Sequence, residues 1–140
     1  MNESTLWDLL KKGMTGRWDA CRIESAVTTG FPDVDFGMIN GTQGKIELKN
    51  LASFPKRPET TVKIPHFTKE QKLWIRNRGR TSGNVWLLVR VLDELFLFTW
   101  SRAVERIGVI RQDQWYEEAK LVLKKPYEWR LLHRALMDGC

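Results

Sequence analysis

Two carboxylates and one lysine in the first third of the 140-residue chain have types and spacing that suit chemistry on phosphate esters. Asp33 follows Pro32, and Glu47 stands fourteen residues later in the run Glu47-Leu48-Lys49. Because side chains alternate across a strand, Glu47 and Lys49 would project from one face and Leu48 from the other. A chain reversal between Asp33 and Glu47 would bring two carboxyl groups and one ammonium group to one sheet edge.

Such a group of side chains is suited to binding a divalent cation. Two carboxylates held close together repel each other, and their pKa values rise unless a cation lies between them. Oxygen ligands favour Mg²⁺ or Mn²⁺, and Mg²⁺ typically takes one or two carboxylates. A cation held by Asp33 and Glu47 would lower the pKa of a water molecule and polarise a phosphate oxygen. Lys49 would orient that water and stabilise the charge that develops at phosphorus. Hydrolysis of phosphodiester bonds is the chemistry these residues suggest.

The local patterns predict the elements that must position these residues. Residues 34–39 and 45–49 read as strands, and Asn40-Gly41-Thr42-Gln43-Gly44 between them has hairpin-turn composition. An amphipathic helix is expected over residues 3–12 and a strand over 18–25. Residues 51–66 form a basic loop that is too rich in proline for a central strand.

The second half of the chain predicts a further helix, two strands and a helical tail. The helix opens at Thr68 and runs to about Arg78, with a loop over 79–84. Strands are expected over 85–91 and 95–100, and Pro126 is expected to start the last helix. The resulting order predicts a single α/β domain with a mixed central sheet flanked by helices, with its core at about 1–100 and its tail at about 101–140.

The sequence resembles the PD-(D/E)xK nuclease superfamily, whose pattern here stands as Pro32-Asp33 followed by Glu47-Leu48-Lys49. Residues 22–25 and 30–33 look like the entry strand and loop of virus-type replication-repair nucleases and archaeal Holliday-junction resolvases. Residues 68–75, with Gln71, look like the helix of that branch that carries a glutamine near the active site. The resemblance covers about residues 17–91.

This resemblance implies a restriction-endonuclease-like core, with the order α-β-β-β-α-β, and a metal-dependent DNA endonuclease. Asp33, Glu47 and the backbone carbonyl of Leu48 would bind Mg²⁺ or Mn²⁺, and Lys49 would serve the attacking water. Gln71 would orient that water or Lys49. The family also has an upstream acidic residue, for which the candidates are Glu24, Glu3 and Asp8.

The charge balance agrees with a nucleic-acid partner. Lys and Arg total 23 against 17 Asp and Glu, which gives a net charge of +6. The resemblance implies duplex or branched DNA as substrate, a homodimer, and a role in phage or bacterial recombination, repair or genome processing. Ser25, Thr28 and Thr29 are candidate phosphate donors. The basic residues expected to contact the phosphate backbone are Lys45, Lys56, Arg57, Lys63, Lys69, Arg76 and Arg80.

Ordinary structural roles compete with several of these interpretations. Glu47 and Lys49 could lie on a solvated strand face, and Thr68-x-x-Gln71 is also a capping box. His66 could touch phosphate or be a plain loop residue. If the charged strand face has no catalytic role, the chain would be a non-catalytic nucleic-acid-binding module or a small interaction protein with a basic surface.

The cysteine count and the hydropathy pattern bear on location. Cys21 and Cys140 lie far apart in the sequence, which predicts reduced thiols and a cytoplasmic protein, in the host cytoplasm if the chain is phage-encoded. Residues 1–18 lack a signal-peptide pattern. The longest apolar run, residues 85–91, is too short to span a bilayer, so no membrane partner is expected.

Overall fold

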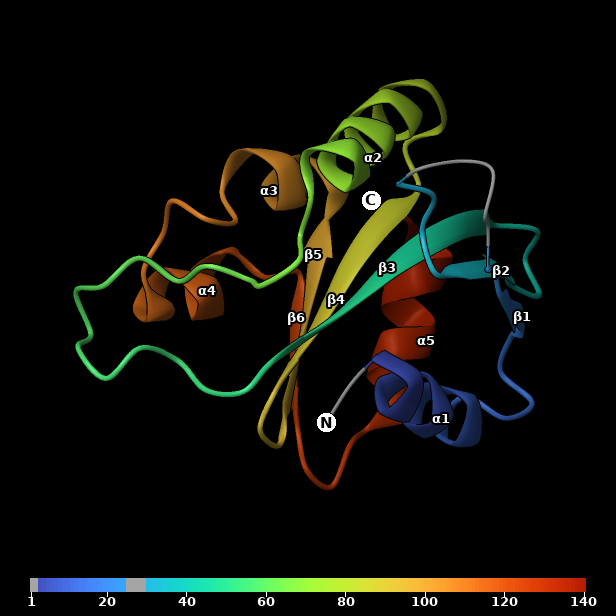
Figure 1. The fold of residues 1–140 in the computed structure, drawn as a ribbon. Coiled ribbons are helices and arrows are strands. Elements are labelled where there is room, and N and C mark those ends of the chain that lie inside the picture. Colours follow the sequence, from blue (N-terminus) through green and yellow to red (C-terminus); the bar gives the residue numbers. More distant parts are fainter. Residues whose placement is uncertain (1–2, 25–29) are drawn as a thin grey trace.

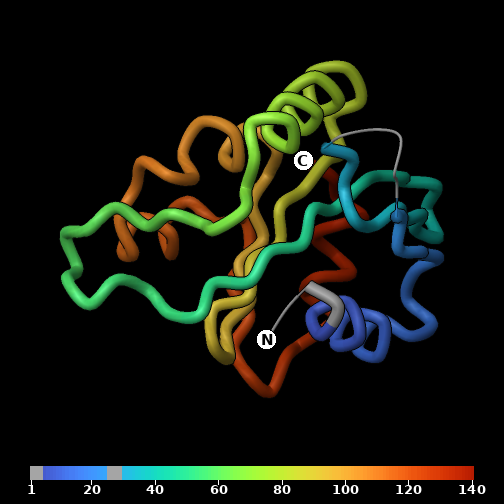
Figure 2. Tube along the Cα trace, in the orientation of Figure 1, coloured from blue at the N-terminus to red at the C-terminus, as the bar shows by residue number. Residues whose placement is uncertain are grey.

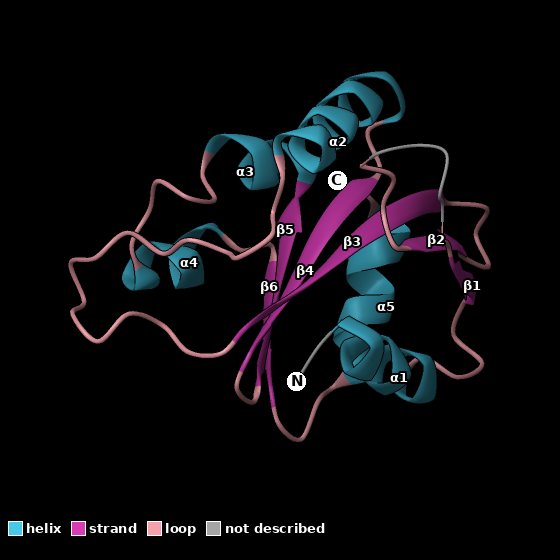
Figure 3. Cartoon of the chain, in the orientation of Figure 1, coloured by secondary structure: helices cyan, strands magenta, loops and turns pink. Residues whose placement is uncertain are grey.

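The computed structural model describes residues 3–24 and 30–140 and contains one six-stranded mixed sheet flanked by helices (Figures 1 and 3). Within these residues, no helix is both long and apolar enough to cross a membrane. The elements are α1 (Glu3–Gly13), β1 (Asp19–Arg22), β2 (Val34–Gly37), β3 (Gln43–Leu51), α2 (Lys69–Ser82), β4 (Val85–Val91), β5 (Glu94–Thr99), α3 (Trp100–Glu105), α4 (Gln112–Glu118), β6 (Leu121–Lys124) and α5 (Trp129–Asp138).

The strands lie in sequence order across the sheet, from β1 at one edge to β6 at the other. All neighbouring pairs are antiparallel except the central pair, β3 and β4. A parallel pair needs a long crossover connection, and here residues 52–68 and α2 supply it. The predicted α/β class, the mixed sheet and the order α-β-β-β-α-β are confirmed.

Each face of the sheet carries its own hydrophobic cluster. Helices α1 and α5 cover one face, where Leu10 and Leu132 pack with Leu48 and Leu88 of the central strands. Helices α3 and α4 and the crossover segment cover the other face, around the fully buried Trp115. Figure 2 traces the crossover segment as it extends alongside α4 before it returns to α2. The domain therefore has three layers, with the sheet in the middle.

Three local predictions differ from the structure. Helix α2 does not end at Arg78 but continues through Gly79 to Ser82. Gly79 is required there because an added Cβ would collide with the Trp100 ring. The part after residue 100 is mostly helical, but it also supplies the edge strand β6, which is too short for alternation to reveal. The last helix begins at Trp129 rather than at Pro126.

Candidate active site

Strand β3 places Glu47 and Lys49 on the sheet face that α3, α4 and the crossover segment cover. Their neighbours in the register are Leu87 and Val89 of β4, which belong to the hydrophobic cluster on that face. Glu47 is 2% exposed and Lys49 is 3% exposed. The side chains thus share a face, as the strand period predicts, but that face is buried rather than solvated.

Asp33 lies beside Glu47 because the β2–β3 hairpin sets the register. Val34 pairs with Ile46, so the residue before Val34 stands opposite the residue after Ile46. The Asp33 Oδ2 accepts a hydrogen bond of 2.9 Å from the Leu48 N–H. The charge of Asp33 and a side-chain interaction with it also raise the pKa of the Glu47 carboxyl group. The two carboxyl groups therefore meet at one position.

In the absence of a cation, the surroundings of the Glu47 carboxyl group favour its protonated form. Burial is the main cause that raises its pKa to about 9, and the charge and hydrogen bond of Asp33 raise it further. Lys49 opposes this shift but does not overcome it. The Glu47 Oε1 is buried without a hydrogen-bond partner among the described residues. An unpartnered carboxyl oxygen in such a place is suited to bind a cation once the group loses its proton.

Three contacts hold the Lys49 ammonium group beside the acidic pair. Its Nζ lies 3.6 Å from the Glu47 Oε2 and donates a hydrogen bond of 2.9 Å to the backbone carbonyl of His66. It also lies 5.8 Å from the centre of the Phe67 ring, whose face attracts a cation. The Lys72 Nζ lies 5.2 Å from the same ring. The end of the crossover segment therefore fixes the position of this lysine.

The loop that carries Asp33 is attached to the first turns of α2. Gly30 has a φ of 83°, in the left-handed region, and an added Cβ would collide with the Glu70 carbonyl oxygen. The Phe31 ring packs edge-on against the Trp74 ring, with 4.9 Å between ring centres. A glycine is therefore required for the close approach that brings Asp33, β3 and α2 together.

Gln71 performs the helix-capping role that its sequence context suggested. Its side-chain oxygen accepts a hydrogen bond of 3.0 Å from the Thr68 N–H. The Thr68 Oγ1 accepts one of 3.1 Å from the Gln71 N–H, which completes a capping box. The capping explanation is therefore established, and the orientation of water or Lys49 by Gln71 remains a separate prediction.

Among the described side chains, no third carboxylate forms a metal-binding group with Asp33 and Glu47. Glu24 is exposed in the segment after β1. Asp8 is exposed on α1, 3.8 Å from Lys11, and α1 covers the opposite sheet face, so the expectation for Asp8 fails for reasons of topology. The Glu3 side chain and the predicted phosphate donors Ser25, Thr28 and Thr29 lie outside the described residues.

The donor set that remains is small but suits a hard cation. Within residues 3–24 and 30–140, no group of three or more His, Cys, Asp or Glu side chains could hold a metal ion. Asp33 and Glu47 nevertheless offer adjacent carboxylates, one with an orphaned oxygen, and Mg²⁺ typically takes no more than two carboxylates. The residues present therefore fit Mg²⁺ or Mn²⁺, with water or phosphate completing the coordination.

Of the basic residues that the sequence predicted to contact DNA, all but one are exposed, on the crossover segment or on α2, and the remaining one forms an ion pair. Lys45 differs from the others because its Nζ lies 2.6 Å from the Asp35 Oδ1 in a half-buried salt bridge. The exposed ones on the crossover segment are Lys56, Arg57 and Lys63, and those on α2 are Lys69, Arg76 and Arg80.

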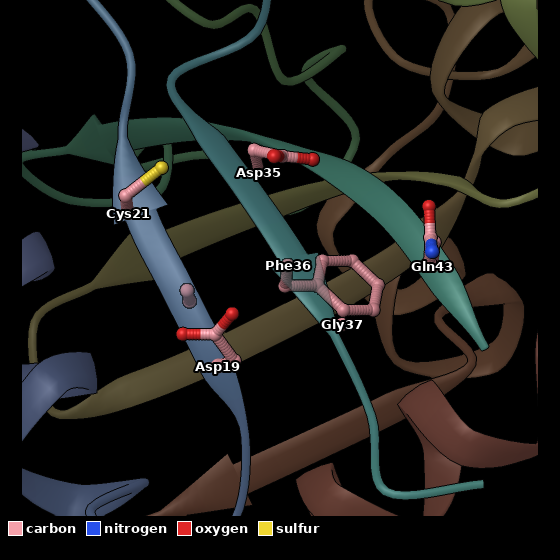
Figure 4. A pocket seen from close by; sticks show the side chains of 7 residues that line it. Asp19, Cys21, Asp35, Phe36, Gly37 and Gln43 are labelled. Atoms are coloured by element: carbon pink, nitrogen blue, oxygen red, sulfur yellow. The ribbon is translucent and has the colours of Figure 1, made fainter. Parts of the chain in front are cut away.

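A shallow hollow of about 240 Å³ lies over β1, β2 and the start of β3 (Figure 4). Its polar lining comes from Asp19, Cys21, Asp35 and Gln43 and contains no basic side chain. By the strand register, Asp35 and Gln43 share the face of Glu47. The lining therefore offers no basic side chain to a phosphate backbone, and one of its carboxylates, Asp35, is paired with Lys45.

Sequence reasoning missed the role of residues 66–67 beside Lys49. The group that holds the ammonium is a backbone carbonyl, which every residue carries, so no residue type marks it. The left-handed φ of 64° at His66 leaves no signature in the sequence either.

Comparisons with known proteins give similarities to solved structures alone. No family model matches the chain, and no curated protein does. Among solved structures, the chain is similar to Hjc, a Holliday junction resolvase of the archaeal hyperthermophile Archaeoglobus fulgidus. The TM-score is 0.46 and the identity 18%, over 68% of this chain and 75% of that chain. At this identity the similarity concerns the course of the chain alone.

Proposed function

We propose that this chain is a Mg²⁺- or Mn²⁺-dependent DNA endonuclease that hydrolyses phosphodiester bonds. The observation that carries the proposal is the half-buried Asp33 carboxyl group beside the buried Glu47 carboxyl group and the buried Lys49 ammonium group. Buried charged groups are poor contributors to stability, and apolar residues of similar size are often as good or better. Ionisable groups buried in the centre of the sheet therefore favour a role in chemistry over a role in stability.

Each residue of the site would have a distinct role in the reaction. Asp33 and Glu47 would hold the cation, with the Leu48 carbonyl as a further ligand. The cation, when bound, supplies positive charge that activates water and polarises the phosphate. Lys49 would orient the attacking water and stabilise charge developing on the phosphate oxygens, because the His66 carbonyl and Glu47 hold its Nζ in place. Gln71 would assist from the start of α2.

The DNA backbone would approach from the side of α2 and the crossover segment. Both carry exposed basic residues, and the Phe67 end of the crossover lies next to Lys49. The lining of the hollow over β1 and β2 includes Asp19 and Asp35 and offers phosphate no basic side chain. The charge distribution thus favours one of the two routes to the acidic pair.

The finer parts of the proposal follow from the motif resemblance. They are a single nuclease domain over residues 1–140, action on branched or junction DNA, a homodimer and a cytoplasmic location. They also include a role in phage or bacterial recombination, repair or genome processing. The part of the chain from Trp100 onward adds strand β6 to the sheet and three helices, α3, α4 and α5, to its faces. This arrangement supports treating the whole chain as one domain.

A cleavage assay tests the proposal. Purified protein is incubated with supercoiled, linear, single-stranded and four-way-junction DNA in Mg²⁺, Mn²⁺ or EDTA. We expect cleavage that needs the cation and is lost in Asp33→Asn and Lys49→Met. Asp35→Asn is the matched control, because Asp35 lies two residues along the same face and pairs with Lys45. If Asp33→Asn and Lys49→Met cleave as fast as the wild type, the site is wrong.

The buried charges also distinguish the enzyme from a non-catalytic binding module. A module that uses only its basic surface would bind DNA without cleaving it under any of these conditions. It would also tolerate Glu47→Gln and Lys49→Met without loss of DNA affinity. Binding without cleavage across all four DNA forms would therefore favour that second function.

A further inference from the structure

His66 adopts a backbone conformation that glycine would adopt more easily. Its φ is 64°, in the left-handed region, and only one other described non-glycine residue, Leu92, has a positive φ. Leu92 lies in the tight turn between β4 and β5, where hairpin geometry calls for positive φ. His66 lies in no hairpin, so this explanation does not apply to it.

The backbone of His66 makes a contact at the site, whereas its side chain makes no hydrogen bond with the described residues. The backbone carbonyl accepts the hydrogen bond from the Lys49 Nζ. The side chain is exposed, and its imidazole makes no hydrogen bond with any residue in the described part of the chain. Glycine would supply the same carbonyl without a side chain in the left-handed region.

The surroundings of His66 suit an anion. Lys63 and Lys69 are exposed on either side of it in the sequence, and Lys72 contacts the neighbouring Phe67 ring. Because the His66 carbonyl lies 2.9 Å from the Lys49 Nζ, the residue stands at the rim of the acidic pair. An imidazole N–H there can donate a hydrogen bond to a phosphate oxygen.

We propose that the His66 side chain contacts a phosphate of the DNA strand beside Lys49. The inference rests on the proposed nuclease function and adds a substrate-contacting residue to its site. Backbone strain at a functional site suggests that the side chain of the strained residue contributes to function rather than to folding. Removal of the His66 side chain therefore weakens substrate binding. Replacement by glycine also stabilises the fold, because the backbone strain is relieved.

The test compares His66→Gly, His66→Asn and Leu92→Gly in the full chain. Asn tolerates the left-handed region, so His66→Asn keeps the backbone and replaces the imidazole with a shorter amide side chain. We expect His66→Asn to lower kcat/KM for cleavage about tenfold, the usual effect of losing one hydrogen bond to a charged group. We expect His66→Gly to do the same while raising the thermal unfolding midpoint. Leu92→Gly should raise the midpoint and leave cleavage unchanged.

Metal-free DNA affinity, measured by fluorescence anisotropy in EDTA, separates this inference from the proposed function. If the wild type cleaves and His66→Asn cleaves and binds equally well, the inference is overturned and the nuclease stands. If the wild type cleaves no DNA, the proposed function fails, and a weaker DNA affinity of His66→Asn still supports the phosphate contact. If the wild type cleaves no DNA and the DNA affinity of His66→Asn is also unchanged, both the proposed function and the phosphate contact are overturned.

Discussion

Replacing Glu47 with glutamine should stabilise the metal-free protein at neutral pH. The folded chain holds this carboxyl group protonated, with its pKa raised from 4.5 to about 9 by burial and by Asp33. In the unfolded chain the same group is ionised at pH 7. Folding must therefore take up a proton, which costs about 3 kcal/mol at pH 7 when each pKa unit is worth about 1.4 kcal/mol. Glutamine is neutral in both states and avoids that cost.

The sign of the effect follows from the raised pKa. Between pH 4.5 and about 9 the folded state binds more protons than the unfolded state, so the contribution of Glu47 to stability falls as pH rises. The advantage of Glu47→Gln should therefore be small at pH 5 and grow by about 1.4 kcal/mol per pH unit. The glutamine amide also preserves a hydrogen-bond donor toward Asp33.

Urea unfolding in EDTA at pH 5, 6, 7 and 8 measures the difference between Glu47→Gln and wild type. Glu24→Gln is the matched control, because Glu24 is an exposed glutamate near the same end of the sheet, and its difference should stay flat with pH. Added Mn²⁺ should stabilise the wild type and not Glu47→Gln. A pH-independent difference, or a destabilised Glu47→Gln at pH 8, would refute the reasoning.

Three further predictions concern the acidic pair, its loop and the DNA surface. Asp33→Asn should lower cleavage at least about hundredfold and tighten metal-free DNA binding, because a negative charge beside phosphate is removed. Gly30→Ala should lower the free energy of unfolding by about 1–3 kcal/mol and slow cleavage, because the new Cβ meets the Glu70 carbonyl. Arg76→Ala should reduce the slope of log affinity against log salt concentration by about 0.9, as expected for one lost phosphate contact.

Each of these predictions has a matched control. Asp35→Asn should change neither cleavage nor its metal dependence, and equal losses in both aspartate variants would point to a general charge effect. Gly41 has a φ of 89° but open space around it, so Gly41→Ala isolates the conformational cost in urea unfolding. If both glycine variants lose the same stability, the Glu70 contact is unimportant. Lys124 is exposed on β6 at the far edge, and an equal salt-slope change in Lys124→Ala would contradict a localised DNA surface.

Local pattern was sufficient to predict the hairpin and the shared face of Glu47 and Lys49. The strand period is fixed by backbone geometry, and the Gly-rich turn defines where the chain reverses. These two facts already place Asp33 near Glu47, and the structure has them adjacent. The capping box at Thr68 and Gln71 is equally local, since all its atoms lie within one helical turn.

Features that depend on contacts between distant residues could not be predicted from the local sequence pattern. Strand β6 is only four residues long and is defined by its pairing with β5. The end of α2 is displaced because Gly79 packs against Trp100, a contact between residues on two different helices. Such contacts depend on how elements meet in space, and a short window of sequence does not contain that information.

The sequence by itself determined which groups could do chemistry and on which strand face they stand. Only the tertiary structure decided that this face is buried. Strand β3 is central and pairs in parallel with β4, so its crossover must pass over one face, and that crossover covers Glu47 and brings the His66 carbonyl to Lys49. Burial in turn raises the pKa of Glu47, because removal from water disfavours its charged form.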